Sequence, residues 1–211
     1  DYALVARAVL RAERGKAHQA QFRYMKLKQQ VNPHFLFNSL NILDCLVCEQ
    51  RTEQASAYIH KLAGIYRYML QNEEETLVRL REEMAFVGMY VDLLQVRFPE
   101  GFRVETDIPD EAMNRHVLPC SVQLLIENAI KHNSVGADRP LVIRIVAGAG
   151  AVTVSNNLQL KVSGTPSTRV GLNYIRQQYL DLSGIPIGIR RTDTESVSYT
   201  HLRAHETDQY L

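Results

Sequence analysis

Two polar clusters in this chain have the residue types and the spacing that phosphoryl chemistry requires. The first is centred on His34, within the apolar run V-N-P-H-F-L-F-N-S-L-N-I-L that begins at Val31. An imidazole accepts a phosphoryl group when a ring nitrogen is exposed and a neighbouring side chain fixes its tautomer. On a helix begun near Asn32 and Pro33, Asn38 lies one turn beyond the histidine and can fix the tautomer. A lone histidine in such a run is also explained by a purely structural role.

The second cluster lies about ninety residues later, in the segment Gln123–His132. Glu127 and Lys131 are spaced four residues apart, as are Asn128 and His132, so a helix would present them on one side. An amide oxygen can bind hydrated Mg²⁺, and cationic side chains can lie near phosphates. The same residues would also make an ordinary solvated helix face, and the spacing alone leaves both interpretations open.

The residues around the first cluster repeat apolar side chains at three and four positions, which is the period of an α-helix. Residues 2–30 are rich in Ala, Arg, Lys, Gln and Leu, which predicts an exposed signalling or coiled-coil helix. Further helices are expected over residues 33–48, 54–71 and 80–98, and Pro99-Glu100-Gly101 ends the last of them. The first half of the chain is therefore predicted to be helical.

The second half has the pattern of a mixed domain. Strands are predicted over residues 102–108, 141–146, 151–154 and 185–189. Helices are expected after Leu118-Pro119 and over residues 171–180. A polar loop over residues 156–168 has the length of a lid or a binding loop. A helical part followed by a mixed part predicts an α+β fold whose two domains meet near residue 99.

Composition excludes several classes of protein. The chain has 211 residues, of which 45% are hydrophobic and 22% charged, and these values are ordinary for a globular protein. Its formal net charge of +1 gives no sign of a nucleic-acid partner. We see no signal peptide and no apolar run of the roughly 20 residues that a spanning helix needs. We expect the chain as given to be soluble, and its abrupt start in helical sequence favours a fragment of a longer protein.

The cysteines Cys45, Cys48 and Cys120 do not form a disulfide framework. Cys45 and Cys48 make a C-x-x-C motif, but a thioredoxin-like site needs a preceding strand and a zinc site needs a second close pair. Because this pair lies in a helical pattern, we expect buried helix cysteines and a reducing compartment rather than redox or metal chemistry.

The C-terminal segment differs in origin from the rest. Val197–Thr207 can be encoded by one reading frame of a common transposase sequencing adapter. We therefore expect native sequence to end near Ser196 and residues 197–211 to be a non-native tail that does not pack, whose two histidines bind no metal. The strand that should pair with residues 185–189 is then expected to be missing, which would leave that strand at a sheet edge or beside a gap.

The first cluster resembles the H-box of the sensor histidine kinases related to the autolysin sensor LytS, whose pattern is approximately Q-x-N-P-H-F-L-F-N-x-L-N. The matching residues are Gln30, Asn32, Pro33, His34, Phe35, Leu36, Phe37, Asn38, Leu40 and Asn41. In that family the histidine accepts the phosphoryl group. The resemblance therefore implies that His34 is the phosphoryl acceptor and that Asn38 assists it.

The second cluster resembles the N-box of the same kinases and of the gyrase/Hsp90-type ATPases. The residues that carry this likeness are Leu118, Pro119, Gln123 and the run E-N-A-I-K-H from Glu127 to His132. The resemblance implies that Asn128 coordinates Mg²⁺ and that Glu127 activates or orients the attacking group. It also implies that Lys131 and His132 belong to the nucleotide site.

The segment between the two boxes also follows the family pattern, through Leu80-Arg81-Glu82-Glu83, Tyr90 and Arg97-Phe98. Arg97 is expected to stabilise the C-terminus of its helix through the helix dipole rather than to act in catalysis.

The glycine-rich segments depart from the family. Its D-x-G-x-G segment corresponds to V-S-N-N-L here, where Asn156 is left to read the adenine with a weaker hydrogen bond than a carboxylate makes. Its later G-x-G-L-x-N pattern keeps Gly171 and Leu172, but Arg169 replaces the first glycine and Tyr174 the asparagine. Glycine permits close backbone approach to phosphates, and Arg169 would supply charge instead.

Taken together, the resemblance implies the cytoplasmic core of a sensor histidine kinase, which binds ATP with Mg²⁺ and transfers the γ-phosphoryl group to His34. It implies a signalling helix over residues 1–27, a helical dimerisation and phosphotransfer hairpin over 28–98, and an ATP-binding α/β sandwich over 99–196. The implied partners are a second copy of the chain and a response regulator that receives the phosphoryl group on an aspartate. A membrane-anchored sensor segment would lie upstream, in the inner membrane.

Two other functions remain open from the sequence. The altered glycine segments are compatible with a degenerate kinase that binds partners without catalysis. The helical first half is also compatible with a non-catalytic coiled-coil dimer that carries an α/β ligand-binding module.

Overall fold

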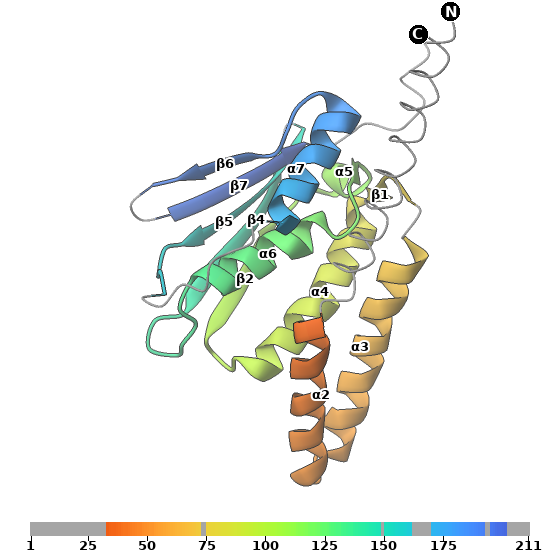
Figure 1. Ribbon diagram of the computed structural model, residues 1–211, viewed down its shortest axis with the longest axis vertical. Coiled ribbons are helices and arrows are strands. Elements are labelled where there is room, and N and C mark those ends of the chain that lie inside the picture. Colours follow the sequence, from red (N-terminus) through yellow and green to blue (C-terminus); the bar gives the residue numbers. More distant parts are fainter. Residues whose placement is uncertain (1–32, 73–74, 149, 162–169, 193–194, 202–211) are drawn as a thin grey trace, which may run out of the picture. The chain divides into compact units, whose positions relative to one another are not determined.

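The first half of the described chain consists of three helices (Figure 1). The computed structural model describes residues 33–72, 75–148, 150–161, 170–192 and 195–201. The helices are α2 (Pro33–Cys48), α3 (Thr52–Gln71) and α4 (Leu80–Arg97), and they confirm the three helices expected there. The helix expected over residues 2–30 lies outside the described residues.

The chain divides into two compact units, residues 1–41 and residues 42–211, and the boundary falls within α2. The second unit contains α3, which buries Ala55, Tyr58, Ile65 and Met69 at helical spacing. In that unit α3 packs against α4, and α4 packs in turn against α6 (Ser121–His132). Helix α4 therefore has packed neighbours on two sides.

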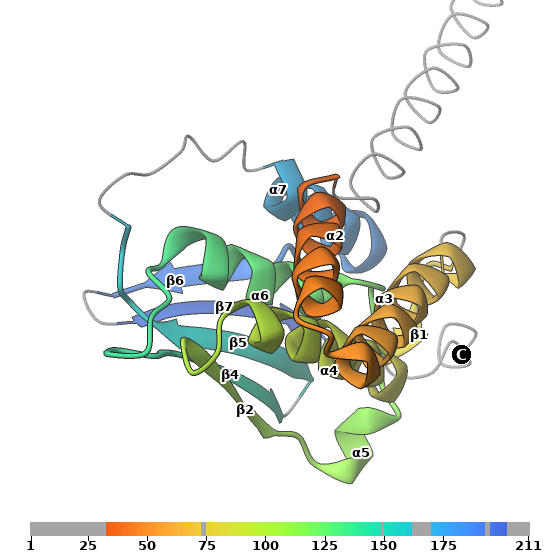
Figure 2. The same ribbon diagram turned by 90° about the horizontal axis from the view of Figure 1, so that it is seen from below.

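A five-stranded sheet makes up most of the rest of the second unit. Its strands are β2 (Phe102–Asp107), β4 (Leu141–Gly148), β5 (Ala151–Asn157), β6 (Gly188–Arg191) and β7 (Glu195–His201). The spatial order is β2-β4-β5-β7-β6; β2 and β4 are parallel and the other neighbours are antiparallel. Helix α6 contacts β4 and β5, and α7 (Val170–Ser183) contacts α6 (Figures 1 and 2). The mixed α+β fold is thus confirmed.

Three short elements were not anticipated. Strands β1 (Val78–Arg79) and β3 (His116–Val117) pair antiparallel and form a separate two-stranded sheet. A four-residue helix, α5 (Asp110–Met113), precedes β3. Elements of two to four residues carry too few side chains to show a period, so no pattern in the sequence predicts them.

The main sheet has a buried face and an open face. Along β4, the side chains of Leu141, Ile143, Ile145 and Ala147 are buried, and the residues between them are more exposed. This alternation follows from the two-residue period of a strand with one face against helices. The buried side chains form the core beneath α6.

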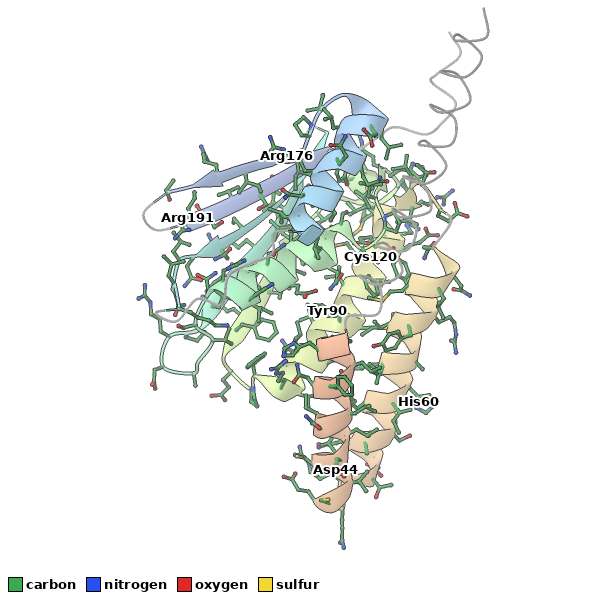
Figure 3. The ribbon with its side chains drawn as sticks, viewed as in Figure 1. Asp44, His60, Tyr90, Cys120, Arg176 and Arg191 are labelled. Atoms are coloured by element: carbon green, nitrogen blue, oxygen red, sulfur yellow. The ribbon has the colours of Figure 1, made fainter. Side chains whose placement is uncertain are left out.

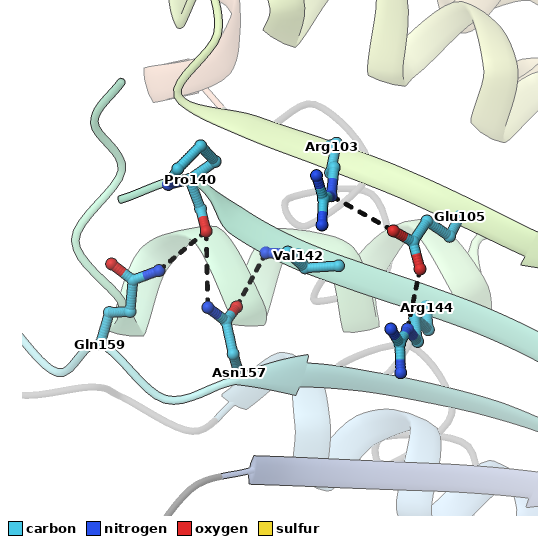
Figure 4. A network of polar contacts seen from close by, with 7 residues as sticks. All are labelled: Arg103, Glu105, Pro140, Val142, Arg144, Asn157 and Gln159. Atoms are coloured by element: carbon cyan, nitrogen blue, oxygen red, sulfur yellow. Dashed lines mark hydrogen bonds and ion pairs between the residues drawn. The ribbon is translucent and has the colours of Figure 1, made fainter. Parts of the chain in front are cut away.

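The open face carries an exposed charge network (Figure 4). Glu105 accepts a hydrogen bond of 2.8 Å from Arg144 Nε, and it lies 3.2 Å from Arg103 Nε in an ion pair. These two arginines lower the pKa of the Glu105 carboxyl, with the Arg144 hydrogen bond as the main cause. All three side chains face solvent, where such pairs contribute little to stability.

The expectation of a missing strand is wrong. Residues 195–201 form β7, which pairs along its length with β5 and on its other side with β6. The ladder is made by backbone amides and carbonyls, so a segment can pair whatever the origin of its side chains. Strand β6 does lie at the sheet edge, as expected, but it spans Gly188–Arg191 rather than 185–189. Residues 202–211 lie outside the described residues.

The expectation of buried helix cysteines is also wrong, because Cys45 and Cys48 are both exposed on α2. Within the described residues, no helix has both the length and the apolar character to cross a membrane.

Candidate nucleotide site and phosphoacceptor histidine

The orientation of Asn128 on α6 suits a cation ligand. Its Nδ2 donates a hydrogen bond of 2.9 Å to the backbone carbonyl of Leu124, one turn earlier. This bond uses the amide nitrogen and fixes the plane of the side chain. The Oδ1 atom is then the one with which Asn128 can bind a cation, which is the role predicted for it.

Glu127 is held by a chain of polar groups that runs from α6 to α4. Gln123 Nε2 donates a hydrogen bond of 3.0 Å to Glu127 Oε2. Gln123 is itself buried, and its side chain is hydrogen-bonded to that of Tyr90 on α4, which Figure 3 labels. Burial, followed by the charge of Glu127, raises the pKa of the Tyr90 hydroxyl. The hydroxyl therefore stays protonated, and the carboxylate has a fixed neighbour.

Gln123 and Tyr90 match the family pattern in the sequence, but the pattern assigns neither of them a role. A usable signal was present, because Gln123 stands four residues before Glu127, the spacing at which two side chains meet on a helix.

Helix α7 starts against the same turn of α6. A Cβ atom built on Gly171 would lie 3.1 Å from side-chain carbons of Leu124, so this position favours glycine. Leu172 packs against the apolar cluster of Leu118, Ile175, Tyr179 and Ile187. The N-terminal turn of α7 is thus fixed near the part of α6 that carries Asn128, and a helix N-terminus favours an anion such as phosphate. Arg169 lies outside the described residues.

Asn156 lies on the buried face of β5. It shares this face with Val152 and Val154, and only 7% of its surface is exposed. Its Nδ2 donates a hydrogen bond of 2.7 Å to the carbonyl of Asn157. The side chain therefore faces the helix side of the sheet, where α6 contacts β5, as a base-reading residue would.

The segment that follows β5 is tied to the sheet and to α6. Asn157 Oδ1 accepts a hydrogen bond of 2.8 Å from the backbone amide of Val142. Gln159 Nε2 donates one of 2.9 Å to the Pro140 carbonyl (Figure 4). Lys161 Nζ donates to the carbonyls of Ile130 and Lys131 at 3.2 and 3.1 Å. This ammonium group satisfies carbonyls at the C-terminus of α6, where a cation is favoured.

Lys131 and His132, the two cations predicted for the nucleotide site, are both exposed at the end of α6. Arg97 stands in the last turn of α4, as predicted, with its guanidinium 4.8 Å from the centre of the Phe98 ring.

His34 and Asn38 lie together on α2. The His34 side chain is exposed, and Asn38 Nδ2 lies 3.2 Å from both of its ring nitrogens. The amide can therefore engage either nitrogen, depending on the tautomer. Both residues belong to the unit that ends at residue 41, whereas α6, β5 and α7 belong to the unit that begins at residue 42.

The second unit thus places the described candidates for nucleotide binding on three elements that contact one another in series, β5, α6 and α7. Among the described residues, no group of three or more His, Cys, Asp or Glu side chains could hold a metal ion. Mg²⁺ does not require one, because it usually keeps several waters and is shared between one or two protein oxygens and substrate phosphates. The fixed Oδ1 of Asn128 fits this mode of binding.

Comparison with known proteins finds histidine kinases. Residues 22–102 match the family model described as histidine kinase. The sensor protein LytS of Bacillus cereus is 39% identical over 106 residues, which are 50% of this chain and 18% of that protein. The sensor histidine kinase/phosphatase LytS of Staphylococcus aureus strain MRSA252 and the sensor protein LytS of Bacillus subtilis strain 168 are 37% and 34% identical over the same coverage.

The chain spans less than a fifth of the length of these relatives. Among solved structures, the cytoplasmic segment of histidine kinase QseC aligns with 61% of this chain and 78% of that chain, at 14% identity and a TM-score of 0.43. Over the half of its length that these relatives cover, the chain is similar to histidine kinases, and in particular to the LytS sensor proteins.

Proposed function

We propose that this chain is the catalytic core of a sensor histidine kinase that transfers the γ-phosphoryl group of ATP to His34. The observation that carries the proposal is the exposed imidazole of His34 with the Asn38 amide 3.2 Å from its ring nitrogens. An acceptor histidine has to be exposed to meet its donor, and it needs a neighbour that selects the nucleophilic nitrogen.

The transfer would form a bond between phosphorus and an unprotonated ring nitrogen of His34. It would break the bond between the γ-phosphorus and the bridging oxygen, and ADP would leave. Glu127, whose carboxylate is held by Gln123, is the proposed acceptor of the imidazole proton. Such a transfer depends mainly on positioning and on neutralisation of charge.

In the nucleotide site, Asn128 would bind Mg²⁺ through Oδ1, and Asn156 would face the adenine. When bound, Mg²⁺ neutralises negative charge on the phosphates. Lys131, His132 and Arg169 are the proposed cationic neighbours of the nucleotide, and Gly171 and Leu172 are proposed to fix the start of α7 beside it.

The proposed partners are a response regulator, whose aspartate would receive the phosphoryl group, and a second copy of this chain. Exposed apolar side chains on α3 support the dimer: Ile59 is 48% exposed and Leu70 is 64% exposed. The proposed cellular setting is the cytoplasmic side of an inner membrane, with the sensor in another part of the protein.

Labelling with γ-³²P-ATP and Mg²⁺ tests the proposal. We expect label that is lost in acid and stable in alkali, as a phosphoimidazole is, and we expect none in the His34→Gln variant. Circular dichroism and nucleotide binding of that variant should equal those of the wild type, because His34 is exposed. Normal ATP binding without label would favour a degenerate kinase, which the altered glycine segments also allow. Failure to bind ATP would favour a non-catalytic dimer.

A further inference from the structure

A buried carboxylate on α4 holds the start of the candidate nucleotide helix. Glu83 has no exposed surface. Its Oε1 accepts a hydrogen bond of 3.0 Å from the Val122 amide, and its Oε2 accepts one of 2.9 Å from the Cys120 amide. The backbone amide of Gln123 also donates a hydrogen bond to this carboxyl group. The first turn of α6 therefore receives its capping acceptor from another helix.

Among the described residues, no side chain at the start of α6 itself caps these amides. The N-cap residue, Cys120, has φ 61° in the left-handed region, and its side chain makes no capping hydrogen bond. Ser121, a residue type that often caps helices, has a buried Oγ without a partner among the described residues. The first amide groups of a helix have no partner within the helix, so loss of Glu83 would leave buried donors unsatisfied.

The same carboxylate is bound to α3. Tyr68 donates a hydrogen bond of 2.8 Å from its hydroxyl to Glu83 Oε2. The Tyr68 ring stacks on Phe86 of α4, with centroids 4.3 Å apart and ring planes inclined by 11°. Tyr68 is therefore fixed by packing as well as by its hydrogen bond, and a shift of α3 would move a ligand of the carboxylate.

We propose that Glu83 is a positioning residue that couples α3 to the nucleotide helix α6, with Tyr68 as the contact on α3. This inference rests on the proposed function. Helix α3 follows the helix that carries His34, and α6 carries Glu127 and Asn128 about two turns beyond its N-cap. A movement of α3 would therefore be transmitted to the nucleotide site through the Glu83 carboxylate.

Protonation of Glu83 gives the coupling a measurable signature. The donors from Tyr68 and from α6 favour the ionised carboxyl, whereas burial favours the neutral one, and burial is the larger effect, raising its pKa to about 7. Tyr68 and Cys120 are the titratable groups of α3 and α6 that face this carboxyl, and Glu82 lies beside it on α4. Removal of the Tyr68 hydroxyl should raise the pKa of Glu83 further.

The test uses Tyr68→Phe in the whole chain, with Tyr66→Phe as the matched control. Tyr66 lies on the same helix, and its hydroxyl is buried without a hydrogen-bond partner among the described residues. Loss of one hydrogen bond to a charged group should reduce autophosphorylation about tenfold in Tyr68→Phe. The acid side of its pH–rate profile should also move to higher pH, and the control should show neither change.

Amide hydrogen exchange provides a readout that does not depend on activity. In Tyr68→Phe the amides of Val122 and Gln123 should exchange faster, while those of Ile143 and Ile145 in β4 should not. Faster exchange without any autophosphorylation in the wild type would refute the proposed function but keep the link between α3 and α6.

Three results would overturn the link itself. These are unchanged exchange at the start of α6 in Tyr68→Phe, the same pH–rate profile as the wild type, or equal effects of the two tyrosine variants. Glu83→Gln is a second variant, whose labelling rate should lose the acid limb that Glu83 causes; persistence of that limb would also contradict the proposal.

Discussion

Two carboxylates, one among the helices and one on the open face of the main sheet, each have several donors, yet they differ in kind. Among the helices, Glu83 of α4 is fully buried and accepts hydrogen bonds from backbone amides at the start of α6 and from the hydroxyl of Tyr68. On the open side, Glu105 is bound by Arg103 and Arg144 in contact with solvent. Burial raises the pKa of Glu83, whereas its arginine partners lower that of Glu105.

The comparison shows that burial, rather than the number of partners, decides how much is lost when a polar contact is removed. Glu105 is exposed, so water can hydrogen-bond to its carboxylate when an arginine is removed, and little stability is lost. Water cannot take the place of Glu83 in the same way, because most of its donors are backbone amides at a buried helix end and would be left unsatisfied. We therefore expect large effects from substitutions on the helix side of the sheet and almost none from substitutions on the open side.

The largest effect is expected at Asn128. Asn128→Ala removes the proposed Mg²⁺ ligand and should weaken Mg²⁺-ATP binding roughly 100-fold, as about 2.7 kcal/mol would. Asn128→Asp should keep binding but change its dependence on the metal. Titration calorimetry measures both.

A matched control is Asn114→Ala, at the exposed end of α5. The affinity of this variant for Mg²⁺-ATP should equal that of the wild type. Wild-type affinity in Asn128→Ala would contradict the role given to this side chain.

The next effect concerns β7, which contributes to both faces. Deletion of residues 197–211 removes most of a strand that lies between β5 and β6, so β6 loses its ladder to the sheet and β5 keeps only its ladder with β4. The loss of several backbone hydrogen bonds should lower the melting temperature by roughly 10 °C.

A truncation after His201 keeps all of β7 and serves as the control. If deletion of residues 197–211 left the melting temperature unchanged, these residues would not be part of the folded sheet.

The third effect is the pH dependence of stability that Glu83 causes. Its pKa is about 7 in the folded chain, above the ordinary value of 4.5 that the unfolded chain should show. Its contribution to stability is therefore fully present below about pH 4.5 and is lost as the pH rises through about 7. The stability of the wild type minus that of Glu83→Gln should fall across this window, as measured by urea unfolding. A difference that stays constant with pH would mean that burial does not raise the pKa of Glu83.

The smallest effect is expected on the open face. Arg144→Ala breaks the hydrogen bond to Glu105 but leaves no buried group unsatisfied. We expect no measurable change in melting temperature and no change in ATP binding. A clear loss of either would show that the open face has a role that its exposure does not reveal.

Much of this organisation is predictable from the sequence, because it depends on local patterns. Pro33 marks the start of α2, and the alternation from Leu141 onward marks β4. The cluster on α6 is visible because four polar residues share one helical spacing. Strand β7 is not predicted from the origin of its sequence, because a ladder depends on the backbone.

The role of Glu83 was missed although a signal existed. Leu80, Glu83, Val87, Tyr90 and Leu94 lie at helical spacing on the buried stripe of α4, and a carboxylate within such a stripe needs buried partners. Which partners these are could not be predicted, because Cys120 and Tyr68 reach Glu83 only in the folded chain.

The central claim is that the exposed histidine on α2 receives the phosphoryl group that the α6 site presents. The most direct test maps the phosphate by mass spectrometry, under alkaline conditions, after incubation with Mg²⁺-ATP. We expect phosphate on the peptide that contains His34 and on no peptide that contains His60 or His132. Phosphate on His132, or on another residue while the His34 peptide stays unmodified, would contradict the account.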